Sequence, residues 1–362
     1  MNRRDLLAAA PATLIAGAAL AQPPAPGAAP GPTPTGPAVA PGAAPGAGRG
    51  AGRAPQAQMP VAEPALPMTI LATGLAFPEA PIWMKDGSLL FVQIAKGQIS
   101  RLTPDNKVET WLDIGDGPNG LAIGPDGALY VANDGNRFGY SPQPDGSAPL
   151  GGPTPAPFRP GRIQRVDMRT KAVTPLYTHV EGKEIIAVDD LVFDKSGGMW
   201  ISEYGRKAGE GAIYYATADG KSIKVARGGL NSPNGIGVSP DGKMLHVSMG
   251  GNLLGFDITG PGKLATNTYP NNGIQGPLQG IADSLKVMAD GLVAVCELAR
   301  PGGIGIHKGS EAEQFLGFPD RYTCNLAFGG ADWQDCWIML SGTGKIAKVR
   351  WPSPGLTPAF HK

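Results

Sequence analysis

Six segments of this chain carry an acid or an amide at the same place, where a short apolar strand is expected to begin. The residues at these strand starts are Glu79, Asn119, Asp189 with Asp190, Asn234, Asp283 and Asn325. All of them offer oxygen atoms, and none is His or Cys. Carboxylate and amide oxygens in this mixture are typical ligands of Ca²⁺, and Mn²⁺ and Mg²⁺ also accept them, whereas Zn²⁺ prefers nitrogen or sulfur. If the fold brings these residues together, they form a candidate divalent-cation site.

Each of these positions taken alone has a plainer interpretation. Asn or Asp before Gly is a common turn residue whose side chain bonds its own backbone, and Asn119 and Asn234 both precede Gly. Two observations favour the cation site instead. The polar residue recurs in step with a repeat, and the segment Phe77-Pro-Glu79-Ala-Pro is not a routine turn.

A repeat of strand, turn and strand must position these residues. Its turn glycines are Gly87, Gly127, Gly197, Gly242 and Gly291, which lie 40, 70, 45 and 49 residues apart. A degenerate sixth copy covers residues 333–341, and the long interval holds a Pro/Gly-rich insertion at residues 137–160. About six units of this length with almost no helical periodicity predict an all-β fold, a six-bladed β-propeller.

The propeller architecture explains why the strand starts matter. The innermost strand of each blade lines the central channel, so the first residues of these strands converge on one mouth. A ring of carboxylates there repels itself unless a cation sits among them. The strand Met68–Ala72 precedes the first repeat. We expect it to complete the last blade, which closes the ring without a free edge.

The chain outside the propeller divides into three parts. Residues 1–21 combine Arg3-Arg4, an apolar run and Ala19-Leu-Ala21, the pattern of an export signal, with a run too short to span a membrane. The arginine pair favours the twin-arginine route, an ordinary secretory signal being the alternative, and predicts a periplasmic protein. Residues 22–66, rich in Pro, Ala and Gly, are expected to be a disordered linker. The propeller then covers 67–354 and a tail covers 355–362.

Composition excludes some partners and chemistries. A net charge of +1 with 17% charged residues gives no reason to expect a nucleic acid partner. The three cysteines have no metal-binding spacing. Cys324 and Cys336 bracket the last hairpin, so pairing in an oxidising compartment is an alternative, but free buried thiols are favoured because the two do not face each other in a symmetric hairpin. No Gly-x-Ser-x-Gly motif supports a serine nucleophile. The oligomeric state is left open.

Four of these segments carry a family resemblance. Residues Phe77-Pro-Glu-Ala-Pro-Ile-Trp83 resemble the first-blade signature of the gluconolactonase/regucalcin (senescence marker protein) family, and residues 117–122, 232–235 and 325–330 resemble its further blade signatures. The resemblance covers residues 68–352. It implies a six-bladed propeller with one divalent ion held by Glu79, Asn234 and Asp283. A third-blade position that contacts metal or substrate in the family falls on Asp189.

The chain departs from the family pattern at three places. The third-blade pair, usually Asn-Asp, is Asp189-Asp190 here, and a third ionised carboxylate is expected to tighten cation binding and weaken Lewis acidity. The fifth-blade Pro-Asp-Gly is Ala282-Asp283-Ser284, with the acid kept. Ala187 stands where animal members place an Arg that grips the sugar. The residues kept from the family pattern therefore imply a lactone as substrate, and a sugar-acid lactone is the narrower expectation.

The resemblance implies metal-assisted hydrolysis of a small lactone. The ion, Ca²⁺ before Mn²⁺, Mg²⁺ or Zn²⁺, would polarise the carbonyl, and Asp283, or Asp189 as second choice, would take a proton from the attacking water. Asn119, Asp190 and Glu203 are candidates for binding substrate hydroxyls. Two alternatives stay open. One is a different ester or organophosphate hydrolase or isomerase on the same metal site, and the other is a propeller that binds a ligand without catalysis around a structural metal.

Overall fold

Six four-stranded antiparallel sheets form the part of the chain that the computed structural model describes, which is residues 65–155, 158–267, 280–299, 301–309 and 311–361. Blade one contains β2 (Pro78–Trp83), β3 (Leu89–Gln93), β4 (Gln98–Leu102) and β5 (Val108–Asp113). Blade two contains β6 (Pro118–Ile123), β7 (Leu129–Asn133), β8 (Arg162–Val166) and β9 (Val173–Tyr177). Blade three contains β12 (Val188–Phe193), β13 (Gly198–Glu203), β14 (Gly211–Thr217) and β15 (Ile223–Leu230).

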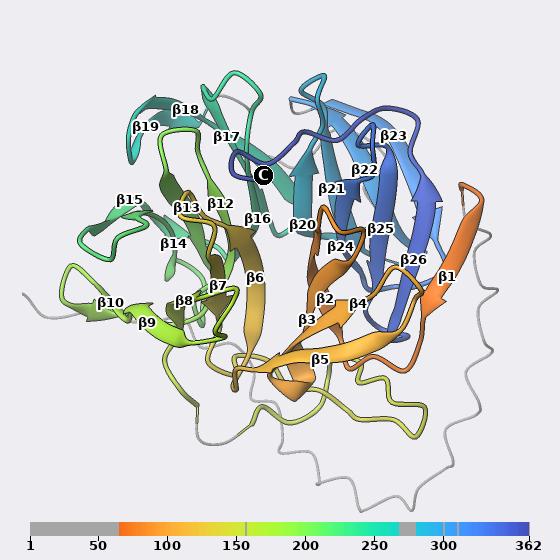
Figure 1. The fold of residues 1–362 in the computed structure, drawn as a ribbon. Coiled ribbons are helices and arrows are strands. Elements are labelled where there is room, and N and C mark those ends of the chain that lie inside the picture. The colour runs from red at the N-terminus through yellow and green to blue at the C-terminus, as the bar shows by residue number, and fades with distance from the viewer. Residues whose placement is uncertain (1–64, 156–157, 268–279, 300, 310, 362) are drawn as a thin grey trace, which may run out of the picture. The chain divides into compact units, whose positions relative to one another are not determined.

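The second half of the chain repeats the pattern. Blade four contains β16 (Pro233–Val238), β17 (Met244–Met249), β18 (Asn252–Gly260) and β19 (Lys263–Asn267). Blade five contains β20 (Ile281–Val287), β21 (Val293–Leu298), β22 (Gly302–Lys308) and β23 (Glu311–Phe318). Blade six contains β24 (Thr323–Gly329), β25 (Asp335–Leu340), β26 (Lys345–Arg350) and β1 (Met68–Ala72). The expected six-bladed β-propeller is confirmed (Figure 1).

The six innermost strands close a ring. In chain order β2, β6, β12, β16, β20 and β24 each pack against the next, and β24 packs against β2. The first strand closes the ring as predicted, because β1 pairs antiparallel with β26, with Met68 opposite Val349. The N-terminal strand therefore covers the edge that blade six would otherwise leave unpaired.

Short elements outside the blades complete the described chain. The 3₁₀-helix η1 (Ile94–Lys96) follows β3, and β10 (His179–Val180) pairs with β11 (Lys183–Glu184) between blades two and three. The Pro/Gly-rich insertion lies between β7 and β8, where the sequence places it. No helix in the described residues has the length and hydrophobicity needed to cross a membrane.

The turn glycines of the repeat are required by their backbone. All five, from Gly87 to Gly291, have φ between 72° and 88°. This left-handed region is costly for any residue with a Cβ. The regular spacing of these glycines therefore marks the position in each hairpin turn that requires a left-handed backbone.

The core consists of apolar clusters between neighbouring blades. Trp200 of blade three packs with Leu245 of blade four, for example, and Phe91 of blade one packs with Trp337 of blade six. The other described clusters join blades one and two, two and three, four and five, and five and six. The apolar burial that stabilises each blade is thus shared with its neighbours.

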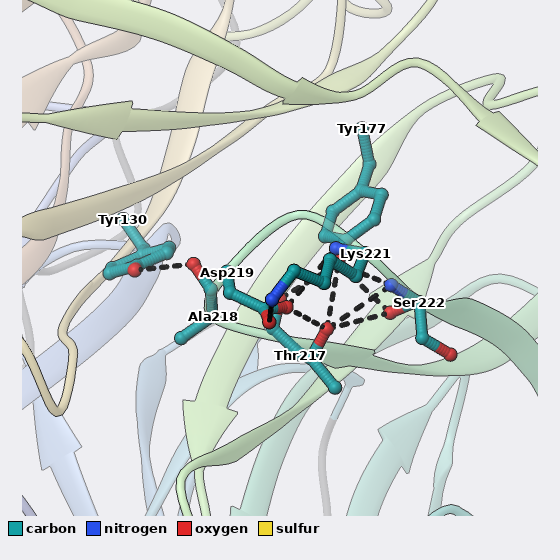
Figure 2. Close-up of polar contacts among 7 residues, drawn as sticks. All are labelled: Tyr130, Tyr177, Thr217, Ala218, Asp219, Lys221 and Ser222. Atoms are coloured by element: carbon teal, nitrogen blue, oxygen red, sulfur yellow. Dashed lines mark hydrogen bonds and ion pairs between the residues drawn. The ribbon is translucent and has the colours of Figure 1, made fainter.

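Polar contacts add to the joint between blades two and three. Figure 2 shows two tyrosines of blade two reaching the turn that connects β14 and β15. The Tyr130 hydroxyl donates to the Ala218 carbonyl over 2.9 Å. The Tyr177 hydroxyl donates to the carbonyls of Thr217 and Ser222 over 2.8 and 2.9 Å. These hydroxyls add hydrogen bonds from blade two to carbonyls of this turn in blade three.

Removing β1 tests the closure of the ring. We compare a chain that begins at Ala65 with one that begins at Thr73, which lacks β1. The shorter chain should lose about 2–5 kcal/mol of unfolding free energy, because apolar side chains of β1 lose their packing against blade six. It should also self-associate through the bare edge of β26. Urea unfolding and gel filtration measure both effects, and equal stability of the two monomeric chains would contradict the role given to β1.

Candidate metal centre

Every innermost strand is irregular at or next to its predicted polar residue. The pairing register shifts between Pro118 and Leu121 in β6, and equivalent shifts occur near the starts of β2, β12, β16, β20 and β24. A bulge of this kind releases one or two residues from the ladder and turns their side chains. The residues released in four strands include the predicted polar ones, whereas Glu79 and Asn325 stay paired, with Val92 and Met339, next to the shift. The end of the channel where these polar residues lie is here called the acidic mouth.

Serine hydroxyls from the second strands tie these bulges together. The Ser202 hydroxyl of blade three donates to the carbonyl of Asn234 in blade four, and Ser248 of blade four donates to the carbonyl of Asp283 in blade five. The Ser341 hydroxyl of blade six donates to the Pro78 carbonyl in blade one over 2.6 Å. Each serine therefore fixes the backbone at, or next to, a predicted metal ligand of the neighbouring blade.

Left-handed backbone flanks two of the predicted ligands. Phe77 and Ala80, on either side of Glu79, have φ of 56° and 46°, and Ser232, two residues before Asn234, has φ of 55°. A residue with a Cβ adopts this conformation at a cost of about 1–2 kcal/mol. Strain of this kind persists where the surrounding structure holds it and concentrates at functional sites. This observation supports the interpretation of Phe77-Pro-Glu79-Ala-Pro as more than a turn.

The acidic mouth brings Glu79 and Asp283 together. A ligand atom of Glu79, one of Asp283 and the sulfur of Cys324 all lie within 4.8 Å of one another. The Asn325 amide donates to Glu79 Oε2 over 2.6 Å, while its own Oδ1 accepts from the Leu326 N–H. Asn325, predicted as one of the ring of oxygen donors, is thus a residue that orients Glu79.

Cys324 was not predicted in this position. The three cysteines are free and buried, as favoured from the sequence. Burial and the carboxylates of Asp283 and Glu79 hold the pKa of the Cys324 thiol well above its ordinary value, and the thiol donates a hydrogen bond to Asp283. A thiol that keeps its proton is a poor metal ligand. It acts here as a donor that orients the carboxylate.

Burial and mutual repulsion dominate the electrostatics of the mouth. Burial first, and the charge of Asp283 second, raise the pKa of both Glu79 and Asp189. The pKa of Asp283 is also raised, mainly by burial, although hydrogen bonds from Cys324 and Asn234 oppose the shift. Three neighbouring carboxyl groups therefore resist ionisation together, as expected for like charges in a site with little water.

The residues present fit a divalent cation. Among the described residues no Lys, Arg or His forms an ion pair with Glu79, Asp189 or Asp283. Within the same part of the chain, the buried Oδ1 of Asn234 accepts no hydrogen bond. Buried carboxylates without a countercharge beside an amide oxygen without a donor form an oxygen-rich set that Ca²⁺ and similar ions bind. Glu79, Asn234 and Asp283 are the residues that would hold the ion. Asp189 stays a predicted ligand, since it is not among the groups whose ligand atoms lie within 4.8 Å of one another.

The residues predicted to bind substrate lie in three different settings. Asn119 is buried at the start of β6. Asp190 is 4% exposed, its Oδ1 accepts from the Leu191 N–H, and its Oδ2 has no partner in the described chain. Glu203 is fully buried, and its two oxygens accept backbone N–H groups of Ile186, Ala187 and Gly205. Its contact with substrate stays a prediction. The hydrogen bonds of Glu203 support the loop before Asp189.

A cavity of about 180 Å³ lies near the other end of the same strands. Its walls are apolar side chains from the distal halves of the innermost strands, such as Ile123, Phe193 and Val287, together with the tail residues 356–359. None of the predicted metal ligands lines it. This cavity is therefore separate from the groups that could do chemistry, and the acidic mouth remains the candidate site.

Asn325 gives a test of how Glu79 is held. Asn325→Ala removes the amide that orients the Glu79 carboxylate, and we expect the affinity for Ca²⁺ or Mn²⁺ to fall about 10- to 100-fold. Titration calorimetry on the metal-stripped protein measures the change. Asn252→Ala, a matched substitution at the start of β18, should leave the affinity unaltered. An unchanged affinity in Asn325→Ala would show that Glu79 does not depend on this hydrogen bond.

The pH dependence of stability tests the repulsion among the carboxyl groups of the acidic mouth. Groups whose pKa is raised by folding hold protons more tightly in the folded state, so the unfolding free energy falls as the pH rises above the ordinary carboxyl range of about 4. We expect the metal-stripped protein to be less stable at about pH 8 than at about pH 5, by at least about 1.4 kcal/mol, the equivalent of one pKa unit. Added Ca²⁺ should stabilise the protein more at the higher pH. Chemical denaturation measures both, and a stability that rises with pH without metal would contradict the account.

Comparisons with known proteins identify the family and the fold. The sequence model of the SMP-30/Gluconolactonase/LRE-like region matches residues 77–342. A gluconolactonase from Zymomonas mobilis is 23% identical over 325 residues, covering 80% of this chain and 83% of its own. A gluconolactonase structure from Xanthomonas campestris has a TM-score of 0.63 at 18% identity and covers 79% of this chain and 89% of its own.

A second solved structure extends the comparison. Regucalcin from Agrobacterium tumefaciens, described as a calcium-binding protein, has a TM-score of 0.62 at 16% identity, with 82% of this chain and 98% of its own covered. At such identities the solved structures establish the fold. The family match covers the acidic mouth itself, from Glu79 to Asn325. This chain belongs to the SMP-30/gluconolactonase/LRE-like family.

Proposed function

We propose that this protein is a metal-dependent lactonase whose active site is the acidic mouth. The observation that carries the proposal is a set of three carboxyl groups, two buried and one half-buried, without a protein countercharge among the described residues and beside an amide oxygen that lacks a donor. The relatives named gluconolactonase give the substrate class, a lactone, with a sugar-acid lactone as the first choice.

A cation held by Glu79, Asn234 and Asp283 would supply Lewis-acid polarisation of the lactone carbonyl and would stabilise the negative charge that develops on its oxygen. Ca²⁺ is the ion we favour, since carboxylate and amide oxygens are its usual ligands and a regucalcin described as calcium-binding shares the fold. Mn²⁺, Mg²⁺ and Zn²⁺ are the alternatives that the assay below compares.

Asp283 is the general base in this proposal. Its side chain is half-buried, whereas Glu79 and Asp189 are buried, so it keeps the best access to water among the three. The Asp283 carboxylate accepts a proton from the attacking water, and the Cys324 thiol and the Asn234 side chain hold that carboxylate by hydrogen bonds. Asp189 is the second candidate for this step.

The remaining polar groups orient the substrate. Asn119 and Asp190 lie on neighbouring innermost strands, and the Asp190 Oδ2 is free to accept a hydroxyl group. The product of ring opening is a hydroxy acid. We also propose that the protein is exported by the twin-arginine route and works on a small molecule in the periplasm, on the strength of residues 1–21.

The experiment that tests the proposal is proton release from glucono-δ-lactone and a panel of other lactones. The metal-stripped protein is assayed alone and after addition of Ca²⁺, Mn²⁺, Mg²⁺ or Zn²⁺. Hydrolysis that requires metal supports the lactonase, and the panel ranks the substrates. Tight metal binding without hydrolysis of any lactone would contradict it and favour another hydrolytic substrate or a ligand-binding propeller.

Asp283→Asn removes the charge of the proposed base, which is also a proposed metal ligand, without changing the volume of the side chain. We expect kcat/KM to fall at least about 100-fold. The metal-stripped variant should be more stable than the wild type at about pH 8, since a buried charge has been removed. The control Asp257→Asn changes a half-buried acid on β18 and should alter neither quantity. An Asp283→Asn protein with wild-type activity would remove Asp283 from the mechanism.

A further inference from the structure

The insertion between β7 and β8 crosses the acidic mouth. We call residues 137–155 the roof. Near its start the Arg137 guanidinium donates to the carbonyls of Gly205 and Arg206 beside blade three, over 3.1 Å each. Figure 1 shows the chain after β7, drawn in yellow-green, running along the end of the propeller opposite to the C-terminus.

The far side of the roof is docked on the other side of the mouth. The backbone of Asp145 approaches Gly74, between β1 and β2, so closely that a Cβ on Gly74 would lie 2.8 Å from the Asp145 carbonyl oxygen. Ser147 approaches Gly344 of blade six to the same degree. A segment fixed at blade three and again at blades one and six spans the acidic mouth, and its inward side chains become part of the site.

Tyr140 joins the roof to the residues around the acidic mouth. Its ring packs on Phe77, two residues before Glu79, with ring centroids 5.0 Å apart. It belongs to the same apolar cluster as Cys324, whose sulfur lies beside Glu79 and Asp283. Burial and the nearby carboxylates of Asp134, Asp189 and Glu79 raise the pKa of the Tyr140 hydroxyl, so it remains a hydrogen-bond donor.

Asp134 offers an acceptor beside this donor. It directly follows β7, is 1% exposed, and its Oδ1 accepts the Arg137 N–H over 3.0 Å, which fixes the start of the roof. Its buried Oδ2 has no partner among the residues that the structure describes. Asp134 is also the acid with the strongest electrostatic effect on Tyr140, and it acts on Asp189 as well. An unpartnered buried oxygen is costly unless a ligand or water satisfies it.

We propose that Tyr140 and Asp134 form a hydroxyl-recognition subsite, so that the enzyme selects lactones that carry ring hydroxyls over unsubstituted ones. Tyr140 donates to a hydroxyl oxygen of the substrate, and that or a neighbouring hydroxyl hydrogen-bonds Asp134. Neither residue is among those predicted from the blade signatures. The inference rests on the proposed lactonase function and adds the feature by which the site distinguishes its substrates.

The test compares a hydroxylated lactone with a bare one. Wild type, Tyr140→Phe and Asp134→Asn, each loaded with Ca²⁺, are assayed on glucono-δ-lactone and on δ-valerolactone. Each variant should raise KM for glucono-δ-lactone about 10- to 100-fold, the usual effect of losing a hydrogen bond of this kind, with a smaller change in kcat. Kinetics on δ-valerolactone should stay within about twofold of the wild type, since that substrate has no hydroxyl to lose.

Controls separate this inference from the proposed function and from damage to the fold. Tyr322→Phe removes the hydroxyl of the other tyrosine that packs on Phe77, at 6.0 Å, and should behave as wild type. Calorimetric titration with gluconate gives a readout without turnover, and its affinity should fall in both subsite variants. Equal losses on both lactones, or no loss on either, would overturn the subsite. A wild-type protein that hydrolyses neither lactone would instead overturn the lactonase proposal.

Discussion

Repulsion among buried carboxyl groups at one end of the channel is the constraint on which the rest of the site depends. The fold creates this repulsion, because six innermost strands begin at the same end and each carries its polar residue at or next to a bulge. Serine hydroxyls and Asn325 then hold the acids close to one another. No described basic side chain pairs with Glu79, Asp189 or Asp283. A bound cation is the simplest source of the missing charge.

Stability and chemistry are located in different parts of the molecule. The apolar clusters lie between blades, and β1 closes the ring far from the channel axis. Those contacts provide the free energy that allows left-handed backbone at Phe77, Ala80 and Ser232 and unpaired oxygens at the acidic mouth. A propeller can therefore keep a strained and electrostatically unfavourable centre, and a cation that offsets the repulsion adds to the stability of the whole domain.

The features predicted correctly from the sequence are local ones, such as turns and the starts of strands. Turn glycines recur because each hairpin needs a left-handed residue, and Glu79, Asn119, Asp189, Asn234 and Asp283 stand at the starts of innermost strands as expected. The closure by β1 followed from the need to cover an edge. The structural role of Glu203 was harder to predict. The backbone N–H groups that donate to its carboxylate come from the loop before β12, which is 16 and 17 residues away in the sequence.

The residue roles that the sequence did not predict depend on contacts between residues far apart in the chain. Asn325 and Glu79 are 246 residues apart, and no repeat pattern tells an amide that binds metal from one that orients a ligand. Cys324 looked like a packing residue because its neighbours Glu79 and Asp283 come from other blades. The insertion has no counterpart in the repeat, so Tyr140 and Asp134 could be placed at the mouth only once its two docking points were known.

The most direct test of the central claim is a crystal structure of the protein soaked in Mn²⁺, with data collected to show the anomalous scattering of manganese. The account predicts one strong peak at the acidic mouth, within about 2.5 Å of oxygens of Glu79, Asn234 and Asp283. A peak at another place, or an empty mouth in the presence of millimolar Mn²⁺, would contradict the assignment of this cluster as the metal centre.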